Sequence, residues 1–251
     1  MRIWICIVVV MSVLAAHAQA QTVKWSGLEW NLRDDTGGPG PNTFSSKNIK
    51  VEKDGSLLVA IVKRNNHWTC AELYTTQALG YGTYQFEVES RVDNLDRNVV
   101  LGLFSYPTAD VGPDGTNEMD IEFARWGNPK YPNGNYTVWP NTPNQNNASS
   151  TFEVKLKNGG ASTHHYTWTP GSVSFESVTG LTGQSSRLIS SWTTPAAFAP
   201  LVGTQPMPVH INLWLFNGKA PSNGNPVEIV LKSFTFTPYS PPPEAAKRRK
   251  P

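Results

Sequence analysis

The chain has few cysteines and few long segments with helical periodicity. It contains only two cysteines in 251 residues, and Cys6 lies in an apolar segment at the N-terminus. If that segment is removed, Cys70 has no partner for a disulfide within the chain, and we expect it to be a small buried side chain. Long runs with the 3.6-residue periodicity of amphipathic helices are also scarce. A disulfide scaffold and a helical bundle are therefore excluded.

An excess of one charge is also lacking. The formal net charge is +2, from 21 basic and 19 acidic side chains. Five of the basic residues lie near the ends of the chain, and without them the body has 16 basic and 19 acidic side chains. These five are Arg2, Lys247, Arg248, Arg249 and Lys250. A nearly neutral body argues against a nucleic-acid partner.

Both ends of the chain differ in composition from its body. Residues 1–20 have the pattern of a secretory signal peptide: Arg2, then an apolar run from Ile3 to Ala16 that is short for a membrane span, then the cleavage motif Ala18-Gln19-Ala20. An uncleaved anchor is the alternative. We expect a protein secreted to the periplasm or the extracellular space, without stable membrane association after cleavage. Residues 240–251 predict a disordered Pro-rich, basic tail, which leaves residues 21–239 as one domain.

The body is rich in turn residues and aromatic residues. Glycine and proline number 20 each and aromatic residues make up 11% of the chain, a balance that favours many short strands. The strands we expect are Trp25–Asn31, Asn48–Val51, Leu57–Val62, Trp68–Tyr74, Gly82–Arg91, Val99–Tyr106, Asn117–Phe123, Thr137–Trp139, His165–Trp168, Val173–Val178, Arg187–Trp192, Met207–Phe216 and Val227–Thr237. Their spacing predicts an all-β fold, a sandwich or jelly roll of two curved antiparallel sheets.

Acidic and apolar residues alternate in the segment 117–123, Asn-Glu-Met-Asp-Ile-Glu-Phe. Successive side chains of a strand point to opposite faces. Glu118, Asp120 and Glu122 therefore share one face, and the apolar residues between them point into a core. Because like charges at this spacing repel, at least one of the three carboxylates should have a raised pKa.

A set of neighbouring carboxylates suits glycoside hydrolysis. One carboxylate attacks or stabilises the sugar, and one carboxylic acid protonates the leaving oxygen. The alternative is a solvated face of an amphipathic strand, but such a face would mix in Lys, Thr and Ser. The sequence therefore favours a catalytic role for the three acidic residues.

The segment Glu118-Met119-Asp120-Ile121-Glu122 resembles the Glu-x-Asp-x-Glu signature of the family 16 glycoside hydrolases. Other segments resemble bacterial lichenases of this family in the same order along most of the chain. They are Trp68–Glu72, Leu79–Tyr84, Leu103–Tyr106, His165–Gly171 and Ile211–Trp214.

The resemblance implies a concanavalin A-like jelly roll and retaining hydrolysis of a β-linked glucan, with mixed β-1,3-1,4 or β-1,3 linkages. It implies that Glu118 is the nucleophile, that Glu122 is the general acid and base, and that Asp120 assists the nucleophile. It also implies a cleft that binds sugar through aromatic stacking and polar contacts. The cleft residues expected are Glu72, Phe104, Tyr106, Trp126, Trp139, Asn212 and Trp214.

The chain departs from the lichenase pattern at three positions. Tyr74 stands where lichenases have an arginine, and Thr116 stands where they have a tryptophan. Ser233 replaces an aspartate associated with a structural calcium ion. No cofactor is expected to be required, and no metal-ligating residues are assigned. A structural calcium ion is possible although its usual aspartate is absent.

Two other functions stay open alongside the secreted endo-β-glucanase. One is a transglycosylase of the same fold, in which a sugar hydroxyl replaces water. The other is a glycan-binding sandwich without catalysis, against which the complete set of three acidic residues argues. The expected partner is a polysaccharide of the β-glucan class, and a monomer is expected.

Overall fold

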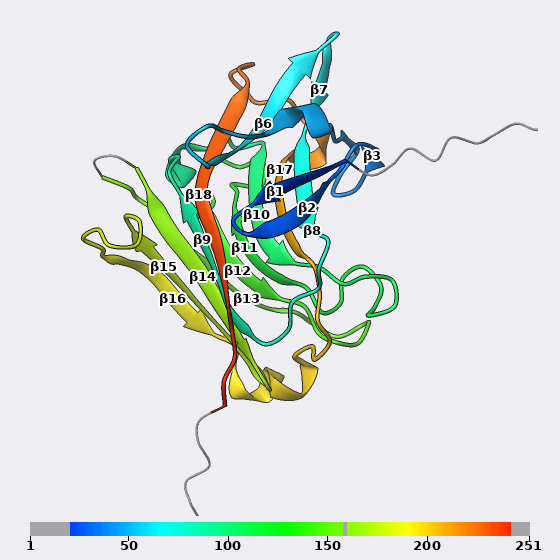
Figure 1. Cartoon of the computed structure of the whole chain (residues 1–251), viewed down its shortest axis with the longest axis vertical. Coiled ribbons are helices and arrows are strands. Elements are labelled where there is room, and N and C mark those ends of the chain that lie inside the picture. Colours follow the sequence, from blue (N-terminus) through cyan, green and yellow to red (C-terminus); the bar gives the residue numbers. More distant parts are fainter. Residues whose placement is uncertain (1–20, 158–159, 242–251) are drawn as a thin grey trace, which may run out of the picture.

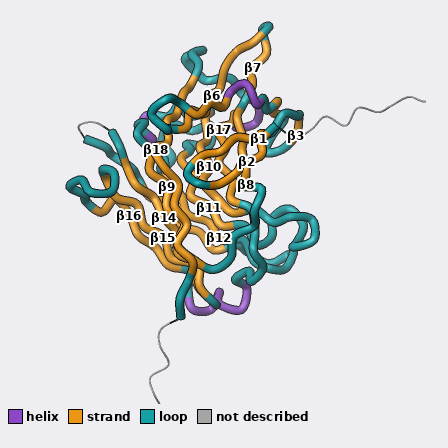
Figure 2. Tube along the Cα trace, viewed as in Figure 1, coloured by secondary structure: helices purple, strands orange, loops and turns teal. Residues whose placement is uncertain are grey.

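The computed structural model describes residues 21–157 and 160–241. The predicted signal peptide and residues 242–251 of the predicted tail lie outside the described residues. Strands dominate, and the helical segments are short 3-10 turns (Figure 2). They are η1 (Ser46–Asn48), η2 (Val92–Asn94), η3 (Ala196–Leu201) and η4 (Phe216–Gly218). No helix among the described residues is long and apolar enough to span a membrane.

The first sheet contains eight antiparallel strands and holds the acidic segment near its middle (Figure 1). In spatial order its strands are β1 (Thr22–Trp25), β2 (Leu28–Leu32), β8 (Ala71–Thr75), β17 (Val209–Leu215), β10 (Val99–Ser105), β11 (Met119–Phe123), β12 (Gly134–Val138) and β13 (Ala148–Phe152). The apolar segment that we predict as a central strand is β10, which lies between β17 and β11 and is buried throughout.

The second sheet packs against the first and completes the sandwich. In order its strands are β16 (Leu188–Thr193), β15 (Ser172–Thr179), β14 (Ser162–Thr169), β9 (Gly82–Val88), β18 (Val227–Pro238), β6 (Leu57–Arg64) and β5 (Ile49–Val51), with β7 (His67–Thr69) paired to β6. A separate small hairpin joins β3 (Thr36–Gly37) and β4 (Asn42–Thr43). Two packed antiparallel sheets confirm the predicted all-β jelly-roll sandwich.

The core contains apolar side chains and a few polar ties between the sheets. Met119, Ile121 and Phe123 have no exposed surface, as their alternation with acidic residues predicts. Tyr166 of β14 bonds the Ser105 hydroxyl of β10, and the Tyr136 hydroxyl of β12 donates to Ser177 of β15 over 2.8 Å. Because buried hydroxyls need such partners, these bonds hold the two sheets in one relative position.

Three local details differ from the sequence prediction. The predicted strand 25–31 is divided by a hairpin turn: β1 ends at Trp25 and β2 begins at Leu28, and Ser26 and Gly27 between them have φ of 51° and 76°, as a two-residue hairpin loop requires. The segment 68–74 is interrupted at Cys70, where the chain passes from the second sheet to the first. β13 is not among the strands expected from the sequence, because this edge strand has little apolar alternation.

Candidate active site

The acidic side chains lie on the face of the first sheet that points away from the second sheet. Residues directly opposite on neighbouring strands share a face, and the register defines two rows across this one. The first row is Glu72, Asn212, Gly102, Glu122 and Asn135. The second row is Tyr74, His210, Phe104, Asp120 and Thr137. Five strands, β8, β17, β10, β11 and β12, thus bring residues distant in sequence onto one floor.

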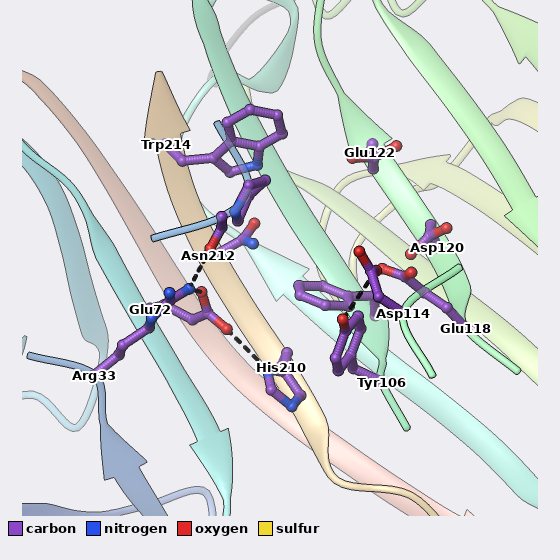
Figure 3. A pocket seen from close by; sticks show the side chains of 13 residues that line it. Arg33, Glu72, Tyr106, Asp114, Glu118, Asp120, Glu122, His210, Asn212 and Trp214 are labelled. Carbon is purple, nitrogen blue, oxygen red and sulfur yellow. Dashed lines mark hydrogen bonds and ion pairs between the residues drawn. The ribbon is translucent and has the colours of Figure 1, made fainter. Parts of the chain in front are cut away.

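A cavity of about 530 Å³ lies over this floor. In Figure 3, Arg33 and Glu72 lie on one side, the acidic residues of the 118–122 segment lie on the other, and the side chains of β17, His210, Asn212 and Trp214, lie between them. The complete lining is Arg33, Gly38, Pro39, Glu72, Phe104, Tyr106, Asp114, Glu118, Asp120, Glu122, His210, Asn212 and Trp214.

Gly102 leaves space at the centre of the floor. A Cβ atom there would lie 2.4 Å from Asn212 Oδ1, closer than real contacts allow. Asn212 is buried, and its Oδ1 atom has no hydrogen-bond donor among the described residues. A buried acceptor without a donor is unfavourable, so this atom is suited to accept a bond from a ligand hydroxyl.

Glu72 is held from two sides. Arg33 Nη1 lies 2.8 Å from Glu72 Oε2, and His210 Nδ1 lies 2.9 Å from Glu72 Oε1. Burial would raise the pKa of Glu72, but His210 and Arg33 together hold it below its ordinary value. The ring of His210 is in turn stacked on Tyr74, with centroids 5.0 Å apart. Glu72 is therefore an ionised, fixed acceptor in the wall of the cavity.

The three acidic residues of the 118–122 segment differ from Glu72, because their pKa values are raised instead of lowered. Burial is the largest cause that raises the pKa of all three residues, to about 8 for Glu118 and to about 7 for Glu122, and it also raises the pKa of Asp120. Repulsion by Glu122 adds to the shifts of Glu118 and Asp120. The cluster therefore retains protons at a pH where exposed carboxyl groups are ionised.

Within this cluster, Asp120 is best suited to hold a proton. It is 4% exposed, and its side chain is hydrogen-bonded to that of Glu118. Trp139 Nε1 donates to Asp120 Oδ2 over 3.1 Å, which leaves the other carboxyl oxygen of Asp120 available to carry a proton in the bond with Glu118. This bond favours the charged form of Glu118. Asp120 thus positions Glu118 and lowers the free energy of its negative charge.

Two of the predicted cleft residues lie outside the cavity lining. Trp139 supports Asp120 as described, and Trp126 packs against Trp214 and Phe216 with ring centroids 6.2 and 5.5 Å away. Direct sugar binding by these two tryptophans stays a prediction. All the other predicted site residues line the cavity. They are Glu72, Phe104, Tyr106, Asn212, Trp214 and the three acidic residues.

Arg33, Asp114 and His210 were not identified from the sequence. His210 alternates with Asn212 and Trp214 along β17, and that period of two is a signal that could have identified it. Arg33 and Asp114 come from loops and have no such signal. Asp114 accepts a bond from the Tyr106 hydroxyl over 3.0 Å, which places a further carboxylate at the rim.

The three departures from the lichenase pattern have different surroundings. Tyr74 lies directly opposite His210 on the neighbouring strand, with the two rings stacked, and Thr116 is 1% exposed with its hydroxyl donating to Pro113 O. Thr116 is therefore no cleft residue. Ser233 donates to Glu87 Oε2 over 2.7 Å. Across residues 21–157 and 160–241, no group of three or more His, Cys, Asp or Glu side chains is arranged to hold a metal ion.

No protein-family model matches the sequence, and no curated protein matches it. Solved structures match its fold. A β-glucanase from Bacillus licheniformis has a TM-score of 0.62 and 20% identity, with 86% of this chain and 95% of that chain covered. A laminarinase from Flavobacterium sp. UMI-01 has a TM-score of 0.61 and 15% identity, covering 82% and 92%.

A family 16 endo-glucanase from Bacteroides ovatus is also similar, with a TM-score of 0.60 and 11% identity, covering 83% of this chain and 94% of that chain. These likenesses establish that the chain has the jelly-roll fold of these glucanases over most of its length.

We predict that Asp120→Asn stabilises the protein at neutral pH. The folded-state pKa of Asp120 is raised, so its contribution to stability is present below the unfolded pKa of about 3.9 and is lost as pH rises. Asparagine cannot ionise, and it retains an acceptor for Trp139 and a donor for Glu118. The melting temperature at pH 8 should rise by about 2–4 °C for each kcal/mol gained, with little gain at pH 4.

Asp93→Asn is the matched control with the opposite sign. Burial would raise the pKa of Asp93, but hydrogen bonds from Arg91 and the Leu156 N–H hold this pKa below its usual value. This substitution should lower the melting temperature at pH 8. A loss of stability in Asp120→Asn that is equal at pH 4 and pH 8 would contradict the electrostatic account.

Proposed function

We propose that this chain is a family 16 glycoside hydrolase, a secreted, monomeric endo-β-glucanase that acts with retention of configuration. The observation that carries the proposal is that Glu118, directly before β11, and Asp120 and Glu122 on β11 line one cavity with aromatic and polar walls. The likeness to glucanase structures supports the reaction class. The substrate is a neutral β-glucan with mixed β-1,3-1,4 or β-1,3 linkages.

In the first step, Glu118 attacks the anomeric carbon as a carboxylate and forms a glycosyl ester. Its charge is stabilised by the bond from protonated Asp120. Glu122 gives its proton to the leaving glycosidic oxygen, and its raised pKa suits this task near neutral pH. The departing chain leaves with a free hydroxyl.

In the second step, Glu122 is ionised and removes a proton from water. The oxygen of that water attacks the anomeric carbon, and the ester bond to Glu118 breaks. Both residues return to their starting states, and the product has the configuration of the substrate. Asn135 Nδ2 donates to Glu122 Oε2 over 3.1 Å and keeps this carboxyl group oriented between the steps.

Glu118→Ala should reduce kcat on barley β-glucan by at least about a thousandfold, because the covalent step is lost. External azide should restore turnover by forming a glycosyl azide of inverted configuration, detected by NMR. The exposed residue Glu228 supplies a control, since Glu228→Ala should have the wild-type rate. Hydrolysis by Glu118→Ala at the wild-type rate without azide would exclude the assigned nucleophile.

The rate on β-glucan should fall as pH rises above about 7, because Glu122 loses the proton that the leaving group needs. In Glu122→Gln, an activated aryl glycoside that needs no protonation should be cleaved without this alkaline decline. The measurement is kcat/KM against pH for both proteins. An unchanged alkaline decline in the variant would remove Glu122 from the acid role.

A further inference from the structure

The β3–β4 hairpin forms a wall at one end of the cavity. Its loop is Gly38-Pro39-Gly40-Pro41, and Gly38 and Pro39 contribute to the cavity lining. It lies beside β2 (Figure 1), and Arg33, which donates to its Gly38 carbonyl oxygen, lies across the cavity from Glu118 and Glu122 (Figure 3). The hairpin is not part of the sheet that forms the floor of the cavity, so it contributes to the wall from outside that sheet.

Arg33 holds the hairpin from the β2 side. Its guanidinium donates to Asp35 Oδ1 and to Gly38 O over 2.7 Å each, while it pairs with Glu72. The same group lies over the Phe44 ring, 3.9 Å from the ring centroid. Since the planar guanidinium has several donors in fixed directions, Arg33 fixes the hairpin relative to the floor of the cavity.

Asn42 holds the hairpin at its other end. Its Nδ2 donates to Leu215 O at the end of β17 over 2.9 Å, and to Pro39 O over 2.7 Å. Asn42 is 3% exposed. A Cβ atom on Gly40 would lie 3.6 Å from the backbone nitrogen of Asn217, so the loop packs directly on the chain after β17. The hairpin therefore extends from β2 across to the end of β17.

This position limits the length of the cavity. Glu122 on β11 and Glu72 on β8 are separated by three strand spacings in the sheet order, which is ~14 Å and the length of about three pyranose rings. The sheet continues beyond β8 through β2 and β1. Arg33, Gly38 and Pro39 line the cavity next to Glu72, because Arg33 contacts both Glu72 and the Gly38 carbonyl oxygen.

We propose that the β3–β4 hairpin sets the number of sugar units that the cavity accepts on the Glu72 side of Glu118 and Glu122, at about two or three. The inference rests on the proposed function and adds a specificity element to it. Because of this limit, the products released from that side are short oligosaccharides. The hairpin acts by blocking further sugar units and does not contact the reacting atoms.

The test replaces the four-residue loop Gly38–Pro41 by Asn-Gly, a sequence that closes a two-residue hairpin and preserves the β3–β4 pairing. Pro170→Asn gives the matched control, since Pro170-Gly171 is the two-residue turn between β14 and β15 in the second sheet. Calorimetry in the full chain carrying Glu118→Gln measures the affinity for β-glucan oligosaccharides of increasing length.

In the protein with the native loop and in the Pro170→Asn control, affinity should rise with oligosaccharide length up to the same limiting length and should not rise beyond it. The shortened loop should move this length upward by at least one sugar unit and strengthen binding of longer oligosaccharides at least threefold. Arg33→Lys is a second variant that keeps a positive charge near Glu72 but cannot contact Gly38 O at the same time. It should move the limit in the same direction.

The four proteins compared are those with the native loop, the shortened loop, Arg33→Lys and Pro170→Asn. An identical limiting length in all four, or no oligosaccharide binding, would overturn the role of the hairpin. Reducing-sugar release from β-glucan by the wild-type protein separates this result from a failure of the proposed function. If the wild type hydrolyses β-glucan while the limit does not move, only the hairpin inference is wrong. If the limit moves without hydrolysis by the wild type, only the proposed reaction is wrong.

Discussion

The site depends on β11 and the residue before it: Glu118 directly precedes the strand, Asp120 and Glu122 lie on its cavity face, and three fully buried apolar residues lie on the other face. Burial of Met119, Ile121 and Phe123 stabilises the fold by about 1.5–3 kcal/mol each. That stabilisation offsets the unfavourable burial and repulsion of Glu118, Asp120 and Glu122. The apolar face thus holds the acidic face in place, and the raised pKa values of the carboxyl groups follow from the same arrangement.

The two walls of the cavity use charge in different ways. On the Glu72 side, Arg33 pairs with the carboxylate and His210 forms a hydrogen bond to it, which leaves a fixed polar surface. On the other side, no cation pairs with Glu118, Asp120 or Glu122 within the described residues, and protons take the place of cations. One wall is thereby suited to binding, and the other is suited to proton transfer.

The sequence predicts the elements whose pattern is local. The alternation in β11 identifies the acidic face, and the apolar run of β10 identifies a central strand. It does not predict contacts that loops make with distant strands, such as that of Arg33 with Glu72 or the position of Pro39 at the cavity end. Aromatic residues near the motif are also ambiguous, because Trp139 can stack on sugar or support Asp120, and the sequence alone does not distinguish these roles.

The central claim is that Glu118 forms a covalent bond to the sugar while Glu122 acts as acid and base. The most direct measurement is mass spectrometry of the protein after incubation with an activated 2-deoxy-2-fluoro-β-glucoside, which slows the breakdown of a glycosyl ester. The account predicts one fluoroglycosyl group per chain, carried by the peptide that contains Glu118. A protein that hydrolyses β-glucan with inversion and gains no label on Glu118 would contradict it.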